Sequence, residues 1–417
     1  MKNKYKPLFS LLIILILAIL VMMATSGCSH DSLKGKTVNF FADAGRSNSF
    51  EDFKDFINYQ YYDEAVKDSN QAGASVAPMP LSNQEIIFAA TDGTISLISN
   101  KEVIWTKRLD AGNVVSAAMC IDPEQNTYAI TNTGLLYSFA YDGKQRWKIK
   151  ICDSISNVDI PCDLIAFEDG IITGITNGLI KKISFDGKVI WNKNLNNTIN
   201  KTISSFDNNL LFSLSSSENN NDTILTLNPD GSEKWRKAMG IRLVKYPISN
   251  GKNIACCGLR YEQSKSFAPI YYLDLNGNII WQTEIQNFVP RYLSISKSGD
   301  LFVNAFQAGL GEQISKIYRY DKDGKEIWQK NFNFTIPTPI LISQTKLAFL
   351  GVTEGSIGLY FVGRDEGIIQ GIMSFSNESP IIHSATVKPD GSISFGYYQN
   401  LGFLTVDRSW FSKIIPW

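Results

Sequence analysis

The sequence predicts an all-β fold, an eight-bladed β-propeller of four-stranded antiparallel blades spanning residues 76–417. Two observations lead to this prediction. A turn followed by a tryptophan recurs at a nearly constant period, and short runs of β-branched and aromatic residues alternate with turn residues inside each period. A period of about 40–47 residues with four strands per unit is typical of propeller blades. Strands of four to eight residues that are bounded by turns leave little room for helix.

The tryptophan marker has the same internal spacing in five units. In each of them three residues separate a turn glycine from the tryptophan: Gly143 and Trp147, Gly187 and Trp191, Gly231 and Trp235, Gly277 and Trp281, Gly324 and Trp328. An earlier unit ends at Trp105 and a degenerate last unit at Trp410. Successive steps from Trp105 to Trp328 are 42, 44, 44, 46 and 47 residues, and the last 82 residues to Trp410 have room for two units. The count is therefore eight.

The recurring tryptophans are expected to be structural. A large aromatic side chain at a fixed place in each blade can bury about 150–250 Å² against its neighbour, and a ring of such contacts is stiff. The predicted structural positions are Trp105, Trp147, Trp191, Trp235, Trp281, Trp328 and Trp410.

Hairpin turns support strands rather than helices. Asp92-Gly93 and Asn177-Gly178 lie between apolar runs, and such dipeptides favour hairpins because type I′ turns need positive φ at both central residues. Helical repeats of similar period are disfavoured by these turns and by the β-branched runs.

Charge and composition exclude one class of partner. The chain has 40 Lys plus Arg and 40 Asp plus Glu, with no long run of like charge. A nucleic-acid-binding protein normally shows a basic excess on one face. We therefore expect no nucleic-acid partner.

The N-terminus reads as an export signal. Lys2, Lys4 and Lys6 precede an apolar run over residues 8–23 and the small residues that lead to Cys28, which is the order of a secretory signal peptide. The Gly-Cys ending resembles the lipobox of bacterial lipoproteins, although Thr25 stands where that family usually has an aliphatic residue. The resemblance implies cleavage after residue 27 and acylation of Cys28. A plain signal peptide or an uncleaved anchor helix is the alternative.

Residues 28–75 are expected to join the lipid anchor to the propeller. Residues 29–49 read as a polar tether, and the spacing of Phe50, Phe53 and Ile57 fits one face of a short helix. Such a helix would pack on the propeller. Three regions are thus predicted: a signal peptide (1–27), the lipidated tether with a short helix (28–75) and the propeller (76–417).

The repeats resemble the PQQ-like, quinoprotein-type propeller family. Its motif, Asp, two residues, Gly, three residues, Trp, is present in Asp274–Trp281 and Asp321–Trp328. One branch of this family contains dehydrogenases that use pyrroloquinoline quinone (PQQ), and the other contains non-enzymatic BamB-like lipoproteins that serve as protein-binding scaffolds. A lipobox followed by a compact eight-unit propeller is more similar to the BamB-like branch.

A quinoprotein dehydrogenase needs more than these repeats supply. The family's calcium ion takes six to eight oxygen ligands, and no dense local cluster of acidic and amide residues is present in the sequence. The Asp321-Lys322-Asp323-Gly324 segment is like the start of a calcium loop, but the far acidic ligand is missing and its place in the repeat explains it as a turn. We expect no resident cofactor or metal, with PQQ and calcium as the alternative.

The cysteines offer two arrangements. Cys256 and Cys257 are adjacent in a predicted inner strand, where neighbouring side chains point to opposite faces, so we expect two buried thiols. Some family dehydrogenases carry a vicinal disulfide, which keeps the enzyme alternative open. Cys152 and Cys162 flank a loop and could form a disulfide in an exported protein.

The sequence lacks the residues that several other kinds of catalytic site need. Histidine occurs only as His30 and His383, which disfavours Ser-His-Asp or Cys-His chemistry and a zinc site. A glycosidase needs only two carboxylates, but nothing singles out a pair. A polysaccharide-binding propeller could use aromatic residues such as Tyr271, Tyr272, Tyr397 and Tyr398, although core packing explains them equally well.

The sequence therefore predicts a non-catalytic scaffold, lipid-anchored on the extracytoplasmic side of the cell membrane or outer membrane. It would bind a protein partner or an extracellular ligand through loop ends or the central funnel. A PQQ-dependent dehydrogenase and a polysaccharide-binding propeller are the alternatives.

Overall fold

A computed structural model describes most of the predicted repeats. The described residues are 38–39, 59–65, 74–375 with gaps at 83–84, 100–101, 153–154, 157–158, 168, 217–220, 264, 308–313 and 354–355, and finally 386–387, 393–396 and 402–408. The predicted signal peptide, Cys28, His383 and Trp410 lie outside them. Within the described residues no helix is long and apolar enough to cross a membrane.

The strands of the described residues form eight antiparallel sheets, numbered here in chain order. Sheet 1 contains β3 (Met79–Pro80), β4 (Glu85–Ala89), β5 (Thr94–Ser99) and β6 (Glu102–Arg108). Sheet 2 contains β7 (Cys120–Ile121), β8 (Thr127–Ile130), β9 (Leu135–Phe139), β10 (Gln145–Lys150) and the short β1 (Val38–Asn39). Sheet 3 contains β11 (Ile165–Phe167), β12 (Gly170–Gly174), β13 (Leu179–Ile183) and β14 (Val189–Asn194). Sheet 4 contains β15 (Thr198–Ile199), β16 (Ser204–Phe206), β17 (Asn209–Ser215), β18 (Thr223–Leu227) and β19 (Glu233–Ala238).

The second half of the chain continues the pattern. Sheet 5 contains β20 (Ile248–Ser249), β21 (Asn253–Cys257), β22 (Arg260–Glu262), β23 (Lys265–Asp274) and β24 (Ile279–Gln286). Sheet 6 contains β25 (Phe288–Ile295), β26 (Leu301–Gln307), β27 (Ser315–Tyr320) and β28 (Glu326–Phe332). Sheet 7 contains β29 (Leu341–Ile342), β30 (Lys346–Thr353), β31 (Ser356–Gly363) and β32 (Ile369–Phe375). Sheet 8 contains β33 (Thr386–Val387), β34 (Ile393–Gly396), β35 (Gly402–Arg408) and β2 (Tyr59–Ala65). The predicted all-β class is confirmed, and among the described residues five sheets have the predicted four antiparallel strands, whereas sheets 2, 4 and 5 have five.

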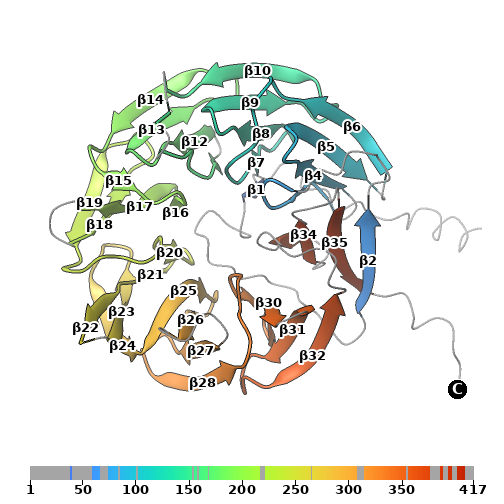
Figure 1. Cartoon of the computed structure of the whole chain (residues 1–417). Coiled ribbons are helices and arrows are strands. Elements are labelled where there is room, and N and C mark those ends of the chain that lie inside the picture. The colour runs from blue at the N-terminus through green and yellow to red at the C-terminus, as the bar shows by residue number, and fades with distance from the viewer. Residues whose placement is uncertain are drawn as a thin grey trace, which may run out of the picture. The chain divides into compact units, whose positions relative to one another are not determined.

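The sheets follow one another around a ring (Figure 1). Strands that come early in their sheets, such as β16, β20 and β25, lie toward the centre, and outer strands such as β10, β14 and β28 lie at the rim. Burial follows the same gradient: β12 is buried along its whole length, whereas β14 alternates between exposed and half-buried residues. A strand that is covered on both faces is apolar along its whole length, whereas a rim strand needs apolar side chains only on the face that is covered.

The core lies between neighbouring sheets. One apolar cluster joins sheets 3 and 4 through residues such as Ile172 and Phe212, and another joins sheets 6 and 7 through Phe302 and Phe349. Neighbouring sheets from sheet 1 to sheet 7 therefore bury their facing surfaces against one another, as expected of propeller blades.

An N-terminal strand completes the last sheet. All seven residues of β2 pair antiparallel with β35, from Tyr59 with Arg408 to Ala65 with Gly402. The predicted short helix rests on Phe50, Phe53 and Ile57, which lie outside the described residues, whereas residues 59–65 that follow them form a strand. The aromatic and β-branched content of β2 and β35 favours strand, and the exposed edge of β35 supplies a hydrogen-bonding partner that local periodicity cannot reveal.

A second strand from the predicted tether also joins the ring. In β1, Val38 pairs with Ile121 and Asn39 with Cys120 of β7. Two strands that precede residue 76 thus belong to the propeller sheets.

Candidate binding site at one end of the propeller

Each described repeat tryptophan bonds to the following sheet. The indole Nε1 of Trp147 donates a hydrogen bond of 2.8 Å to the carbonyl of Phe185, which lies in the turn between β13 and β14. The other five tryptophans make the same bond at 2.9–3.0 Å: Trp105 donates to the carbonyl of Tyr141, Trp191 to that of Pro229, Trp235 to that of Leu275, Trp281 to that of Lys322 and Trp328 to that of Arg364. These contacts join sheets 1 to 7 in sequence, so the tryptophans hold the ring rather than a ligand.

The turn glycines lie directly under the indoles. Gly143 has φ +79°, and a Cβ placed on it would be 2.6 Å from Cδ2 of Trp105. Glycine adopts a positive φ without strain, and it has no Cβ that would collide with the indole. The same contact recurs down the chain, so each of these turn glycines makes room for the tryptophan of the preceding sheet rather than for the one four residues after it.

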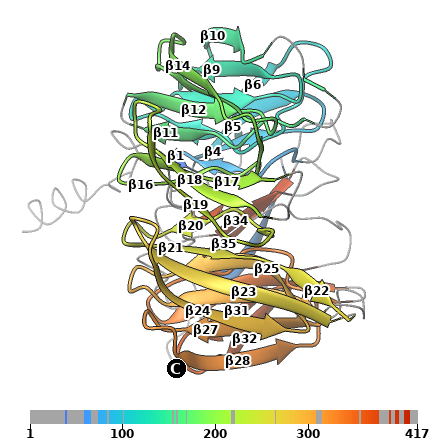
Figure 2. The ribbon, with the colours of Figure 1, turned by 90° about the vertical axis from the view of Figure 1, so that its left-hand side faces the viewer.

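The two ends of the ring differ in their connections. The Asp-Gly turns before each outer strand lie at one end, the turn end. The other end, the connection end, carries the links from one sheet to the next and those between the second and third main strands. These second-to-third links are tight turns in sheets 1 to 3, such as Asp92-Gly93, and are longer in sheet 5, where β22 and β23 extend as a hairpin. In Figure 2 the long β23 crosses the side of the ring with β22 at its end.

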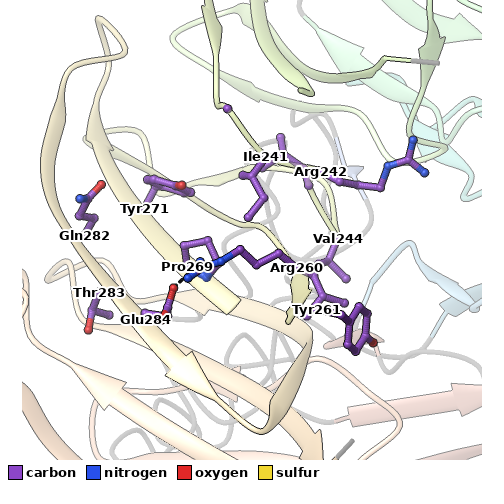
Figure 3. Close-up of a pocket in the computed structure, with 13 residues that line it drawn as sticks. Ile241, Arg242, Val244, Arg260, Tyr261, Pro269, Tyr271, Gln282, Thr283 and Glu284 are labelled. Carbon is purple, nitrogen blue, oxygen red and sulfur yellow. Dashed lines mark hydrogen bonds and ion pairs between the residues drawn. The ribbon is translucent and has the colours of Figure 1, made fainter. Parts of the chain in front are cut away.

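A cleft of about 1060 Å³ opens beside this hairpin, between sheets 4 and 5 (Figure 3). One wall is the link Gly240–Val244, and the other is built from β22, β23 and β24. Buried Asp222 positions the link, because its Oδ2 accepts the backbone N–H of Leu243 at 2.8 Å and its Oδ1 accepts that of Ser216 at 3.0 Å. The wall is thus held from within sheet 4.

Polar and aromatic groups line the cleft. Arg260 forms ion pairs with Glu262 at 2.8 Å and Glu284 at 2.5 Å, and its guanidinium stacks 4.9 Å from the ring centre of Phe267. Tyr261, next along β22, is 64% exposed, and Tyr271 lines the floor. Exposed aromatic side chains and arginine are enriched in protein-binding surfaces. The residues that line the cleft therefore favour the binding of a polypeptide over catalysis.

A row of cations lies near this end, close to the innermost strands. Lys201, Lys245 and Arg291 each stand ten residues after a repeat tryptophan, namely Trp191, Trp235 and Trp281. They precede or join the innermost strands β16, β20 and β25, which contact one another in order. All three side chains are half-buried. This cation row was not anticipated, although its constant offset from the tryptophans is visible in the sequence.

A buried ionic network ties sheets 6 and 7 at the turn end. Oδ2 of Asp300 accepts hydrogen bonds from Arg319 at 2.7 Å and from Arg364 at 2.9 Å. Arg319 also donates to the carbonyl of Arg364 and to the carboxylate of Asp365. Buried charges are tolerated when paired in this way. The network is structural, and sequence spacing gave no signal for it.

The adjacent cysteines separate as predicted. Cys256 packs in the cluster between sheets 4 and 5, whereas Cys257 joins a different cluster. Burial raises the pKa of both thiols, that of Cys257 to about 12. Neither forms a disulfide, so the expectation of two buried thiols is confirmed.

The proposed bridge between Cys152 and Cys162 is absent from the structure. Cys162 is wholly buried in the cluster of sheets 3 and 4, with its Sγ directed at the carbonyl of Asn200. Cys152 packs against the cluster of sheets 2 and 3. The two thiols therefore belong to different packing layers, which the shortness of the intervening loop did not reveal.

Other sequence candidates have local structural roles. Tyr272 is buried and stacks on Trp281, with ring centres 4.8 Å apart. Oδ1 of Asp321 accepts the backbone N–H groups of Asp323 and Lys325, as a turn residue does. Among the residues that the structure describes, no group of three or more His, Cys, Asp or Glu side chains could hold a metal ion. Tyr397 and Tyr398 lie outside those residues.

Known structures share this fold. BamB from Moraxella catarrhalis matches with a TM-score of 0.56 and 14% identity, covering 84% of this chain and 99% of that one. Saccharomyces cerevisiae Sqt1 matches with a TM-score of 0.58 and 12% identity over 84% and 98% of the two chains. The Dos1 propeller matches with a TM-score of 0.59 and 11% identity over 84% and 94%. The TM-scores show a shared propeller fold, and at identities this low the likeness extends to the fold alone.

No curated protein matches the sequence. A family model does match, and its description is outer membrane protein assembly factor BamB. The match confirms the predicted resemblance: residues 176–338 are similar to the PQQ-like propeller repeats of that family.

Proposed function

We propose that this protein is a lipoprotein anchored through Cys28 on the extracytoplasmic side of a membrane, and that its eight-bladed, non-catalytic propeller is a scaffold for a protein partner. The cleft between sheets 4 and 5 carries the proposal. It lies at the connection end, has an exposed aromatic on its rim and takes its walls from two sheets joined by buried contacts. The BamB family match covers both sheets, which supports a scaffold over an enzyme.

The chemistry of the cleft also favours binding over catalysis. One of its cations, Arg260, is held by two carboxylates, and another, Arg242, donates to the carbonyl of Ser216, so the cleft presents fixed charges of both signs. A rigid, pre-formed surface binds a partner with little loss of conformational entropy. The tryptophan contacts between sheets supply that rigidity.

In-cell photo-cross-linking tests the proposal. p-Benzoylphenylalanine placed at Tyr261, on the cleft rim, is expected to capture a distinct protein. The matched control replaces Tyr141, which is 44% exposed at the turn end, and should capture little. Equal capture at both positions, or none at Tyr261, contradicts a partner at the cleft.

A cofactor titration separates the scaffold from the quinoprotein alternative. The scaffold predicts no saturable change in tryptophan fluorescence when the full protein is titrated with PQQ and calcium. Saturable binding at micromolar cofactor would replace the scaffold with the dehydrogenase.

A further inference from the structure

The cation row is built by the repeat itself. Lys201 and Lys245 are 44 residues apart and Lys245 and Arg291 are 46 apart, the same steps that separate Trp191, Trp235 and Trp281. The corresponding position after Trp328 is neutral Thr338, and after Trp105 it is neutral Val115. Three consecutive sheets thus place a cation at one structural position, close to the innermost strands, in a chain whose net charge is zero.

Two members of the row have no carboxylate partner among the described residues. Nζ of Lys201 donates at 2.7 Å to the neutral carbonyl of Ser116. Nζ of Lys245 stands 5.2 Å from the ring centre of Tyr292, and its charge is opposed by the neighbouring Arg291. Burial and that repulsion lower the pKa of Lys245. A half-buried positive charge without an anion is unfavourable, so an anion that reached it would bind strongly.

Aromatic rings frame the same surface. The guanidinium of Arg291 lies 5.0 Å from the ring centre of Phe306, and Lys316 of the same sheet lies about as close to Phe288 and Tyr318. The rings hold the cations by cation–π attraction. The row is therefore positioned before any ligand arrives.

We propose that the row Lys201–Lys245–Arg291 binds an extended acidic segment, rich in Asp and Glu, of the partner protein. The inference rests on the proposed function and deepens it by stating the chemistry of the partner. An extended chain can reach half-buried cations near the innermost strands of three adjacent sheets.

Binding of a labelled peptide tests the inference directly. Fluorescein-labelled deca-glutamate is titrated into the full-length protein in detergent and followed by fluorescence anisotropy. Saturable binding that weakens as salt rises is expected, and deca-lysine should not bind. Lys245→Gln and Arg291→Gln should each weaken binding about tenfold, as for a desolvated charge pair. Lys245→Arg should restore it.

Lys188→Gln is the matched control, because it removes the same charge from an exposed turn-end position. It should bind as the wild type does, and a thermal melt of each variant shows that folding is retained. Equal affinity of Lys245→Gln and wild type overturns the inference, as does equal weakening by Lys188→Gln. Phosphatidylglycerol vesicles that compete fully with the peptide also overturn it, in favour of a lipid surface. Cross-linking at Tyr261 without any deca-glutamate binding overturns this inference alone and leaves the scaffold function standing.

Discussion

Substituting alanine for a turn glycine separates two contributions to the stability of the ring. At Gly143, φ is +79° and the new Cβ would lie 2.6 Å from the indole of Trp105. At Gly251, φ is +80° but no heavy atom lies within 4 Å of the new Cβ. Both variants lose about 1–2 kcal/mol from the left-handed backbone. Only Gly143→Ala also displaces an indole, which adds about 1–3 kcal/mol.

Urea unfolding followed by far-ultraviolet circular dichroism measures the difference. The free energy of unfolding of Gly143→Ala should fall below that of Gly251→Ala by the amount of the clash. In a Trp105→Ala background the obstacle is gone, and Gly143→Ala should then cost no more than Gly251→Ala does. Equal destabilisation by the two single variants refutes the reasoning, and so does an excess that persists without the indole.

Replacing Cys28 by alanine should leave the propeller folded and move it from the membrane pellet to the soluble fraction; a variant retained in the pellet contradicts the lipid anchor. Cys256 and Cys257 should resist alkylation at pH 8 in the folded protein, because burial raises both pKa values, and should react in urea; peptide mass spectrometry detects early labelling that would argue otherwise. Asp300→Asn leaves two arginines without their shared carboxylate and should lower the free energy of unfolding by about 3–5 kcal/mol; an unchanged urea midpoint would show that the network is not stabilising. Deleting residues 59–65 should lower the melting temperature by removing one strand of sheet 8, and an unchanged melt would show that the strand does not contribute.

Local signals in the sequence predicted most of the fold. Pairs such as Gly187 and Trp191 located the turns and outer strands, because turn glycines from Gly143 to Gly367 pack against the tryptophan of the preceding sheet and the described repeat tryptophans bond to the following one. The short helix predicted from Phe50, Phe53 and Ile57 stays a prediction, because these residues lie outside the described ones. No local signal predicted the strand at residues 59–65, which pairs with β35 far along the chain. The spacing of apolar residues indicates which face of an element is buried, but it cannot indicate that the element pairs with a strand far along the chain.

The binding site was less predictable than the fold. The cleft takes residues from a link, a hairpin and a rim strand, and only their packing brings Arg242, Tyr261 and Glu284 together. The cation row was accessible in principle, since counting ten residues from each tryptophan reveals it. The network of Asp300, Arg319 and Arg364 was not, because its members have no constant spacing.

The pairing of β2 with β35 determines when sheet 8 can be completed during biosynthesis. Ala65 and Gly402 are 337 positions apart in the chain, and at about 5–20 residues per second the ribosome needs roughly 20–70 s to traverse them. Throughout that time β2 has been made but its partner has not, so the nascent chain carries an unsatisfied strand edge that invites aggregation. Sheet 8 can be completed only after residues 402–408 have been made, so closure of the ring is the last step of folding to become possible.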